Sequence, residues 1–351
     1  MVLAVLLFLC CFSLEVFASY RLLWFNRKDL PIEEVGFESR GKPQTALALR
    51  SVLFHLQKLA MKKSLIALAV LGFTGAAMAQ SSVTLYGVAD AGVARTQTVD
   101  ANGNKTSKTG MSSAGTMNHG NSRLGVRGVE DLGGGMKVGF NFETGLSLKD
   151  GATATSGGGF WGRAANVWLG DFWGTFLMGR TLNPSYYGIA AWELTSLANY
   201  SAVANTYSYN GMGARSSNQF TYSTPNFGGL SASVGYIAKD DNGGNSKWDL
   251  NAIYANGPIA AGLSVNKQQQ SKTNYTLGGK YNFGSFAVAA SYNNVYATGT
   301  SLKRRGFSLG GRANLGAFAV TLDLTRDTKN DISGKKYTNG VLEGKYALSK
   351  R

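Results

Sequence analysis

The residues best suited to do chemistry in this chain are arginines set among small polar residues. Arg180 and Arg215 lie within Arg180–Gly229, the longest stretch that does not alternate like short strands, and Glu193 is its only acid. Guanidinium groups stay charged and bind carboxylates, phosphates and other anions. If these side chains meet around a narrow space, that space is electropositive and concentrates anions.

Further charged candidates lie outside this stretch. Arg123 and Arg127 belong to an alternating segment, and Glu143 is the acid of another such segment. Arg163 opens a segment whose alternation is less clear, because it shares parity with Val167 and Leu169. Either a bulge intervenes there, or those apolar residues pack against something inside the wall. Arg123, Arg163, Arg180 and Arg215, with Glu193, Glu143 and Arg127, form the predicted set of site residues. The alternative is that some of these arginines pair with carboxylates such as Asp90 and only hold the structure together, because carboxylate pairing is common for arginine.

Enzyme chemistry finds little support in the residues from Gln80 onward. They contain one histidine, His119, which we interpret as a solvent-exposed loop residue, and they lack a nucleophile elbow, a phosphate-binding Gly-Lys-Ser/Thr loop and a paired-histidine metal motif. The acidic run at 240–244 resembles a calcium loop only faintly. We therefore predict no catalytic site, no metal and no cofactor.

The rest of the chain is a series of short segments that alternate between apolar and polar residues. Phe318, Val320, Leu322 and Leu324 against Ala319, Thr321, Asp323 and Thr325 is the clearest case. A period of two indicates strands with one apolar face. About fourteen are expected: 83–93, 123–128, 136–148, 163–170, 175–180, 218–223, 230–239, 248–256, 259–269, 275–283, 286–296, 308–314, 318–327 and 338–348. Residues 93–120 are expected to form a polar loop.

These strands favour a transmembrane antiparallel β-barrel over a soluble sandwich. Many approach the roughly ten residues that cross a bilayer at a tilt. Their second faces carry Thr, Asn, Ser and Asp, which suit a water-filled interior, and short turns alternate with longer loops. Aromatic residues near strand ends would form interface girdles, although each is equally explained as an ordinary strand aromatic: Tyr86, Tyr236, Trp248, Tyr281 and Tyr292.

Net charge does not point to nucleic acid. From Gln80 onward there are 26 Lys and Arg and 15 Asp and Glu, so the net charge is 26 − 15 = +11. The basic residues are scattered singly, and the one basic run, Lys303-Arg304-Arg305, falls between two expected strands. A charge run in that place is usually a solvated loop, so we predict no nucleic-acid partner.

The N-terminal residues indicate export. Met61-Lys62-Lys63 precedes an apolar run and then Ala77-Met78-Ala79, which predicts a signal peptide at 61–79 cleaved before Gln80. Residues 1–60 are then expected to be a non-native extension from a start codon set too early, or else an N-terminal anchor. Both cysteines lie there, at Cys10 and Cys11, and a cysteine-free mature chain suits an oxidising compartment.

Several motifs, in order, resemble the trimeric outer-membrane general porins of the beta-proteobacterial and neisserial type. The motifs are Ser82-Val83-Thr84-Leu85-Tyr86-Gly87, Arg123-Leu124-Gly125-Val126-Arg127-Gly128, Leu177-Met178-Gly179-Arg180 and Thr224-Pro225-Asn226-Phe227-Gly228-Gly229. The resemblance implies a sixteen-stranded barrel, a homotrimer in outer-membrane lipid and lipopolysaccharide, and diffusion of small anions and hydrophilic solutes. It also implies a third loop that folds inward, and an arginine cluster at Arg123, Arg163 and Arg215.

This sequence differs from the porin pattern at its C-terminal end. Porins of this type continue past a turn like Ser349-Lys350-Arg351 with two more strands and end on Phe. We therefore expect residues 80–351 to be a porin barrel that lacks its last two strands, and we hypothesise a truncated or frameshifted gene whose product assembles poorly by itself. The alternatives to a diffusion channel are a non-conducting barrel that serves as an adhesin or antigen, and a non-functional gene fragment.

Overall fold

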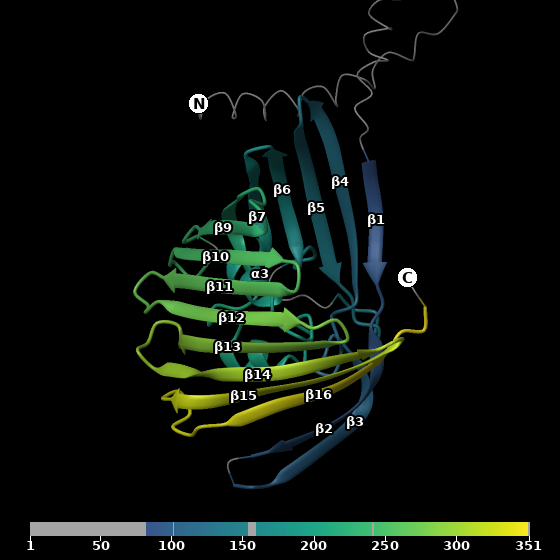
Figure 1. Ribbon diagram of the computed structural model, residues 1–351, viewed down its shortest axis with the longest axis vertical. Coiled ribbons are helices and arrows are strands. Elements are labelled where there is room, and N and C mark those ends of the chain that lie inside the picture. Colours follow the sequence, from purple (N-terminus) through teal and green to yellow (C-terminus); the bar gives the residue numbers. More distant parts are fainter. Residues whose placement is uncertain (1–81, 101, 154–158, 241, 350–351) are drawn as a thin grey trace, which may run out of the picture. The chain divides into compact units, whose positions relative to one another are not determined.

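The described part of the protein is almost entirely antiparallel β-structure (Figure 1). This computed structural model describes residues 82–100, 102–153, 159–240 and 242–349. The predicted extension at 1–60 and signal peptide at 61–79 lie outside these residues. Within them, no helix has the length and apolar character needed to cross a membrane.

In the part of the chain that the structure describes, fourteen strands form one sheet in the order β1-β4-β5-β6-β7-β8-β9-β10-β11-β12-β13-β14-β15-β16. Each strand pairs antiparallel with its neighbour in this order. The bounds are β1 Ser82–Val88, β4 Arg123–Gly133, β5 Met136–Gly145, β6 Ala164–Asp171, β7 Gly174–Leu182, β8 Arg215–Ser223, β9 Leu230–Ile237, β10 Lys247–Asn256, β11 Ile259–Gln268, β12 Asn274–Asn282, β13 Phe286–Tyr296, β14 Lys303–Leu315, β15 Phe318–Asn330 and β16 Thr338–Tyr346. These fourteen correspond one to one with the fourteen strands expected from alternation.

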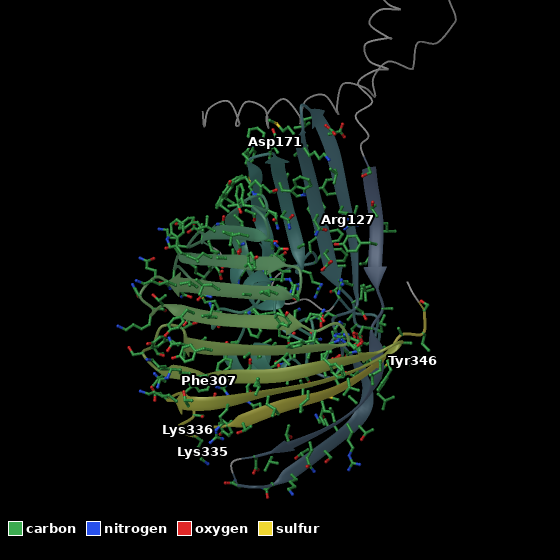
Figure 2. The ribbon with its side chains drawn as sticks, viewed as in Figure 1. Arg127, Asp171, Phe307, Lys335, Lys336 and Tyr346 are labelled. Carbon is green, nitrogen blue, oxygen red and sulfur yellow. The ribbon has the colours of Figure 1, made fainter. Side chains whose placement is uncertain are left out.

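The alternation runs opposite to that of a water-soluble protein. On β15 the side chains of Leu322 and Leu324 are 47% and 44% exposed, whereas Thr321 and Asp323 are 1% and 4% exposed. The same contrast recurs on other strands, and Figure 2 shows the side chains that line both faces. Exposed leucine beside buried carboxylate and hydroxyl groups suits a sheet with hydrocarbon outside and a polar interior.

One predicted loop contains a hairpin. The expected strand at 83–93 ends at Val88, and the chain continues as β2, Ala91–Val99, which pairs with β3, Lys105–Ser113, in a separate two-stranded sheet. The prediction of a plain loop at 93–120 was therefore wrong. Because threonine and serine occupy both faces of this hairpin, no apolar alternation marked it. Its turn is fixed locally, since the Asp100 carboxylate accepts the backbone N–H groups of Asn102 and Asn104.

A second correction concerns the basic run at 303–305. Lys303-Arg304-Arg305 begins β14 instead of forming a loop between strands. Arg304 forms an ion pair with the buried carboxylate of Asp327 on β15, with 2.9 Å between Nε and Oδ1. The run therefore lies in a strand, and Arg304 has a carboxylate partner across the sheet.

The long non-alternating stretch is shorter than predicted and is partly helical. Strand β7 continues to Leu182 and β8 already begins at Arg215, so the connection covers 183–214. It holds α3, Pro184–Ala190, and α4, Ala202–Tyr207. Its apolar side chains form a small hydrophobic core with β13: Ile189, Trp192, Leu194, Leu197, Val203, Ala204 and Tyr207 with Ala287, Ala289 and Val295.

Glycines on the polar face of the sheet allow this connection to lie close against it. A Cβ atom at Gly278 would be 2.2 Å from the Trp192 ring, and one at Gly262 would be 2.0 Å from the carbonyl oxygen of Gly188. Gly278 and Gly262 are directly paired on β12 and β11. The two paired glycines therefore form a flat area on the sheet, and the Trp192 indole and the C-terminal part of α3 pack against it.

A carboxylate from the sheet holds the start of α3. Oδ1 of Asp249 on β10 accepts both the backbone N–H and the hydroxyl of Ser185, each at 2.6 Å. Asn251 on the same strand donates to the carbonyl of Pro184 at 2.7 Å. The first N–H groups of a helix lack partners within the helix, so these side chains stabilise α3 in one position on the sheet.

Candidate functional site

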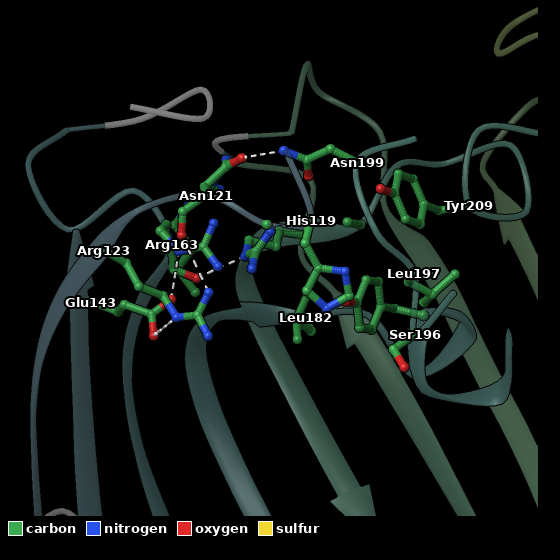
Figure 3. Close-up of a pocket in the computed structure, with 15 residues that line it drawn as sticks. His119, Asn121, Arg123, Glu143, Arg163, Leu182, Ser196, Leu197, Asn199 and Tyr209 are labelled. Carbon is green, nitrogen blue, oxygen red and sulfur yellow. Dashed lines mark hydrogen bonds and ion pairs between the residues drawn. The ribbon is translucent and has the colours of Figure 1, made fainter. Parts of the chain in front are cut away.

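Between the 183–214 connection and strands β4 to β8 lies a cavity of about 610 Å³ (Figure 3). Four of the predicted arginines and one predicted acid line it: Arg123, Arg163, Arg180, Arg215 and Glu143. The other lining residues are His119, Gly120, Asn121, Leu182, Tyr186, Ser196, Leu197, Asn199, Tyr209 and Ala214. Arginines thus come from the sheet side, and mostly neutral side chains come from the connection.

Glu143 organises two of the arginines. Its Oε1 lies 2.6 Å from Nε of Arg163, and its Oε2 lies 3.6 Å from Nε of Arg123. The Tyr86 hydroxyl also donates to Oε2 of Glu143 at 2.9 Å. Glu143 is on β5, and its polar face is the one that alternation predicted. One carboxylate thus fixes the direction of two guanidinium groups without matching their charge.

Arg163 breaks the alternation of its strand because it precedes the regular part of β6. Strand β6 begins at Ala164, which pairs with Glu143, and the Arg163 N–H donates to the Glu143 carbonyl. Val167 therefore faces outward, although it shares odd numbering with Arg163, which is only 9% exposed and faces the cavity. The sequence left open either a bulge or apolar packing inside the wall. The structure shows neither, because the pairing of β5 with β6 has no register shift and the change of direction lies before the strand begins.

Arg180 reaches the cavity through an irregularity in β7. The register between β7 and β8 shifts between Gly179 and Thr181, and Gly179 has a φ of +120°. Without the shift, Arg180 would share the outward face with Met178. Its Nε donates to the carbonyl of Gly162 at 2.6 Å, and its Nη1 donates to the Ser217 hydroxyl at 2.8 Å. Bulges commonly redirect side chains in this way.

Arg215 is the first residue of β8 and completes the group. Its Nε donates to the backbone carbonyl of Arg163 at 3.0 Å. A carbonyl oxygen orients a guanidinium group but does not neutralise it. Four arginines and one glutamate among the lining residues give 4 − 1 = +3, so the cavity wall is electropositive.

Two predicted site residues lie elsewhere. Glu193 is 3% exposed and does not line the cavity; its carboxylate accepts the Thr195 hydroxyl, the Ser201 hydroxyl and the Leu197 N–H. It holds the bend between α3 and α4. Arg127 is not a lining residue either, and its guanidinium lies 5.3 Å from the centre of the Tyr86 ring.

Tyr86 differs from the girdle residues with which it was grouped. It pairs with Gly125 of β4, and its hydroxyl donates to Asn141 and Glu143 on the polar face. It therefore faces inward, so the girdle interpretation was wrong for this residue. The signal that could have shown this is its numbering, because Tyr86 alternates with the apolar pair Leu85 and Gly87 in the sequence.

His119 is one of the lining residues that sequence reasoning missed, and among these it is the one that can carry a charge near neutral pH. It was interpreted as an exposed loop residue without a role; its side chain is exposed, but it lines the cavity with the arginines. Its neighbours fix it from both sides, because Asn118 and Gly120 each donate to the Asp90 carboxylate, at 2.7 and 2.8 Å. The spacing of Asp90 from these residues carries no local pattern, so only the fold reveals the contact.

Comparison with known proteins identifies the family. A family described as Gram-negative porin matches residues 64–351. The chain belongs to that family. It is 39% identical over 244 residues to outer membrane porin protein 32 of Delftia acidovorans, covering 64% of this chain and 67% of that protein. It is 33% identical over 274 residues to an outer membrane porin protein of Bordetella pertussis, covering 66% of this chain and 69% of that protein.

Solved structures agree with this porin family. The fold is similar to that of an anion-selective porin from Comamonas acidovorans, with a TM-score of 0.63 and 29% identity over 77% of this chain and 86% of that one. The expected fold class, a transmembrane antiparallel β-barrel, and the expected location in the outer membrane are thus confirmed. The comparisons support an outer-membrane diffusion channel.

Proposed function

We propose that this porin is a passive diffusion channel for small hydrophilic solutes that prefers anions, with the arginine-lined cavity as its selective constriction. The observation that carries the proposal is the convergence of four arginines and one carboxylate on a single cavity. The similar solved porin from Comamonas acidovorans is described as anion-selective, which supports the same preference here.

The physical basis is fixed charge at the narrowest point of a water-filled path. Ion selectivity follows from charged side chains that line a constriction. The sheet supplies the arginines, while Asp249 and the wall glycines hold the opposite side in place. Because the Arg215 guanidinium donates to a neutral backbone carbonyl, that contact leaves its positive charge to act on a passing anion.

A reversal potential tests the proposal directly. The purified chain is reconstituted in a planar bilayer with a tenfold KCl gradient, and the sign of the zero-current potential reports whether chloride or potassium permeates faster. We expect chloride preference. Cation preference, or a potential that does not change when the cavity arginines are replaced by glutamine, would contradict it.

The second candidate is a barrel that does not conduct and serves as an adhesin or antigen. The β2–β3 hairpin, which carries Arg95, Lys105 and Lys108, favours this alternative because its exposed strands form a separate small sheet outside the fourteen-stranded one. Release of small sugars and amino acids from liposomes separates the two functions. Loss of solute at the rate of empty liposomes would favour the non-conducting barrel.

The remaining partners are also proposals. We infer a homotrimer in a membrane that contains lipopolysaccharide, as the family implies, and we expect no enzymatic activity. In the described residues there is no group of three or more metal-ligating side chains. Crosslinking of the detergent-solubilised chain tests the trimer.

A further inference from the structure

His119 occupies a position from which its charge acts on the same space as the arginines. It lines the cavity together with Arg123, and a Cβ atom at the adjacent Gly120 would lie 3.7 Å from Nη1 of Arg123. Figure 3 draws the imidazole among these lining side chains. A proton on the ring would add one positive charge to a wall that already carries +3 from its arginines and glutamate.

Hydrogen bonds hold the backbone around His119 in place beside the cavity. Besides the two hydrogen bonds to Asp90 on its flanks, its carbonyl accepts the N–H of Asn199 at 3.1 Å. Its Nδ1 lies 3.5 Å from the Tyr200 hydroxyl, with the two ring centres 6.3 Å apart. These contacts come from both sides of the cavity, the β1–β2 connection and the 183–214 connection.

We propose that His119 is a selectivity-determining residue whose protonation strengthens the anion preference of the channel. The inference rests on the proposed function, because a titrating charge changes selectivity only if the cavity lies on the ion path. Histidine is the side chain whose charge changes near neutral pH. Acidification would therefore convert a +3 wall into a +4 wall.

The surroundings of His119 determine the pH range in which its imidazole gains a proton. Although the His119 side chain is exposed, loss of hydration against the cavity wall and then the charge of Lys345 on β16 hold its pKa below the usual range. Glu343, Asp90 and Glu193 act more weakly in the opposite direction. The Tyr200 hydroxyl, which faces Nδ1 of His119, donates its proton to Glu343 at 2.5 Å. Since the pKa is lowered, the extra charge is absent at neutral pH and appears as the pH falls through a value below 6.5.

Reversal potentials between pH 8 and pH 5 test the inference in three proteins: the wild type, His119→Gln and His119→Lys. We expect the wild-type anion-to-cation permeability ratio to rise about two- to fourfold on acidification, as expected for one added charge near the path. The glutamine variant should lack this rise, and the lysine variant should show a high ratio throughout. Carboxylate titration is common to all three proteins and cancels in the comparison.

Identical pH profiles in the wild type and in His119→Gln would overturn the inference while leaving the proposed function intact. Cation preference at pH 8 in every variant would instead overturn the proposed function.

A second measurement, by NMR, does not depend on conduction. In the ¹⁵N-histidine-labelled chain in detergent, His119→Gln identifies the His119 signal against that of His55, the other histidine of the chain.

The same signal shows whether His119 responds to the charges around the cavity. We expect it to titrate below 6.5, and we expect Lys345→Gln to raise its pKa because the neighbouring positive charge that lowers it is removed. A histidine in a fully solvated loop would titrate near its ordinary value and would not respond to Lys345→Gln, and this result would overturn the inference.

Discussion

The charge of the cavity wall is a sum over single residues of both signs, so mutation of one residue can raise it and mutation of another can lower it. Glu143 is the only carboxylate among the lining residues, and Arg215 is one of four arginines. A unit charge about 5 Å from the ion path contributes roughly 0.8 kcal/mol in water, which is about fourfold in local ion concentration. Local charge, and not the mere presence of polar groups, is thus expected to set the selectivity.

The first prediction follows from this division. Arg215→Gln should lower the anion-to-cation permeability ratio by about fourfold at low salt, and Glu143→Gln should raise it. The second change keeps the side-chain shape, so the geometry of Arg163 and Arg123 is disturbed as little as possible. Reversal potentials at low salt measure both. A fall in the ratio for both variants would show that Glu143 acts only by holding the arginines in place.

Residue types could be predicted from the sequence, but the directions of several side chains could not. Arg123 and Glu143 follow strict alternation, so their inward direction was evident. Arg180 faces the cavity only because the register of β7 against β8 shifts, and His119 lines it only because Asp90 holds its neighbours. Both depend on contacts between segments far apart in the chain, which a local pattern does not contain.

At the scale of elements, the irregularity in β7 is itself testable. Gly179 has a φ of +120°, and a Cβ atom there would lie 2.3 Å from the carbonyl oxygen of Ala165. Gly179→Ala should therefore cost about 1–3 kcal/mol of unfolding free energy and should turn Arg180 away from the cavity. Urea unfolding followed by tryptophan fluorescence measures the first effect, and the reversal potential measures the second.

The matched control is Gly92→Ala, a strand glycine whose added Cβ would meet nothing within 4 Å. It should leave both the unfolding midpoint and the selectivity unchanged. If Gly179→Ala unfolded at the same urea concentration as Gly92→Ala, β7 would tolerate a side chain at this position, and the account of how Arg180 is directed would be wrong.

A second element-level prediction compares two adjacent glycines of β12. A Cβ atom at Gly278 would be 2.2 Å from the Trp192 ring, whereas one at Gly279 would have its nearest neighbour at 3.8 Å. Gly278→Ala should push Trp192 and the connection away from the sheet and toward the arginines, at a cost of about 1–3 kcal/mol for overpacking. We expect a smaller single-channel conductance with more open-channel noise.

Gly279→Ala adds the same methyl group to the other face of the same strand and should conduct like the wild type. Equal conductance of the two variants would show that the connection does not depend on contact with the glycine-lined wall. The strand pattern predicted β12 itself, because alternation is a property of neighbouring residues. It did not predict the close contact of Gly278 with Trp192, because the glycine carries no side chain to mark the place.

For the whole molecule, the fold class could be predicted because the alternating strands approach the length that crosses a bilayer and carry a polar second face. The structure adds that the apolar face is the exposed one, as on β15. The β2–β3 hairpin was not predicted because its two faces are equally polar and show no alternation. The net charge from Gln80 onward is +11. Anion preference could therefore arise either from charges on the distant surface or from the arginines of the cavity. The two sources differ in range, because the Debye length is about 30 Å at 0.01 M salt and about 3 Å at 1 M.

Two triple variants that each remove three positive charges distinguish these sources. Arg163→Gln/Arg180→Gln/Arg215→Gln changes the cavity, and Arg95→Gln/Lys105→Gln/Lys108→Gln changes the exposed hairpin, whose residues do not line the cavity. We expect the cavity variant to lose anion preference at both salt concentrations. The hairpin variant should lose a little at about 0.01 M and nothing at about 1 M, because screening already removes the influence of distant charges there. If both variants lost the same preference at the higher salt concentration, the selectivity could not come from the constriction.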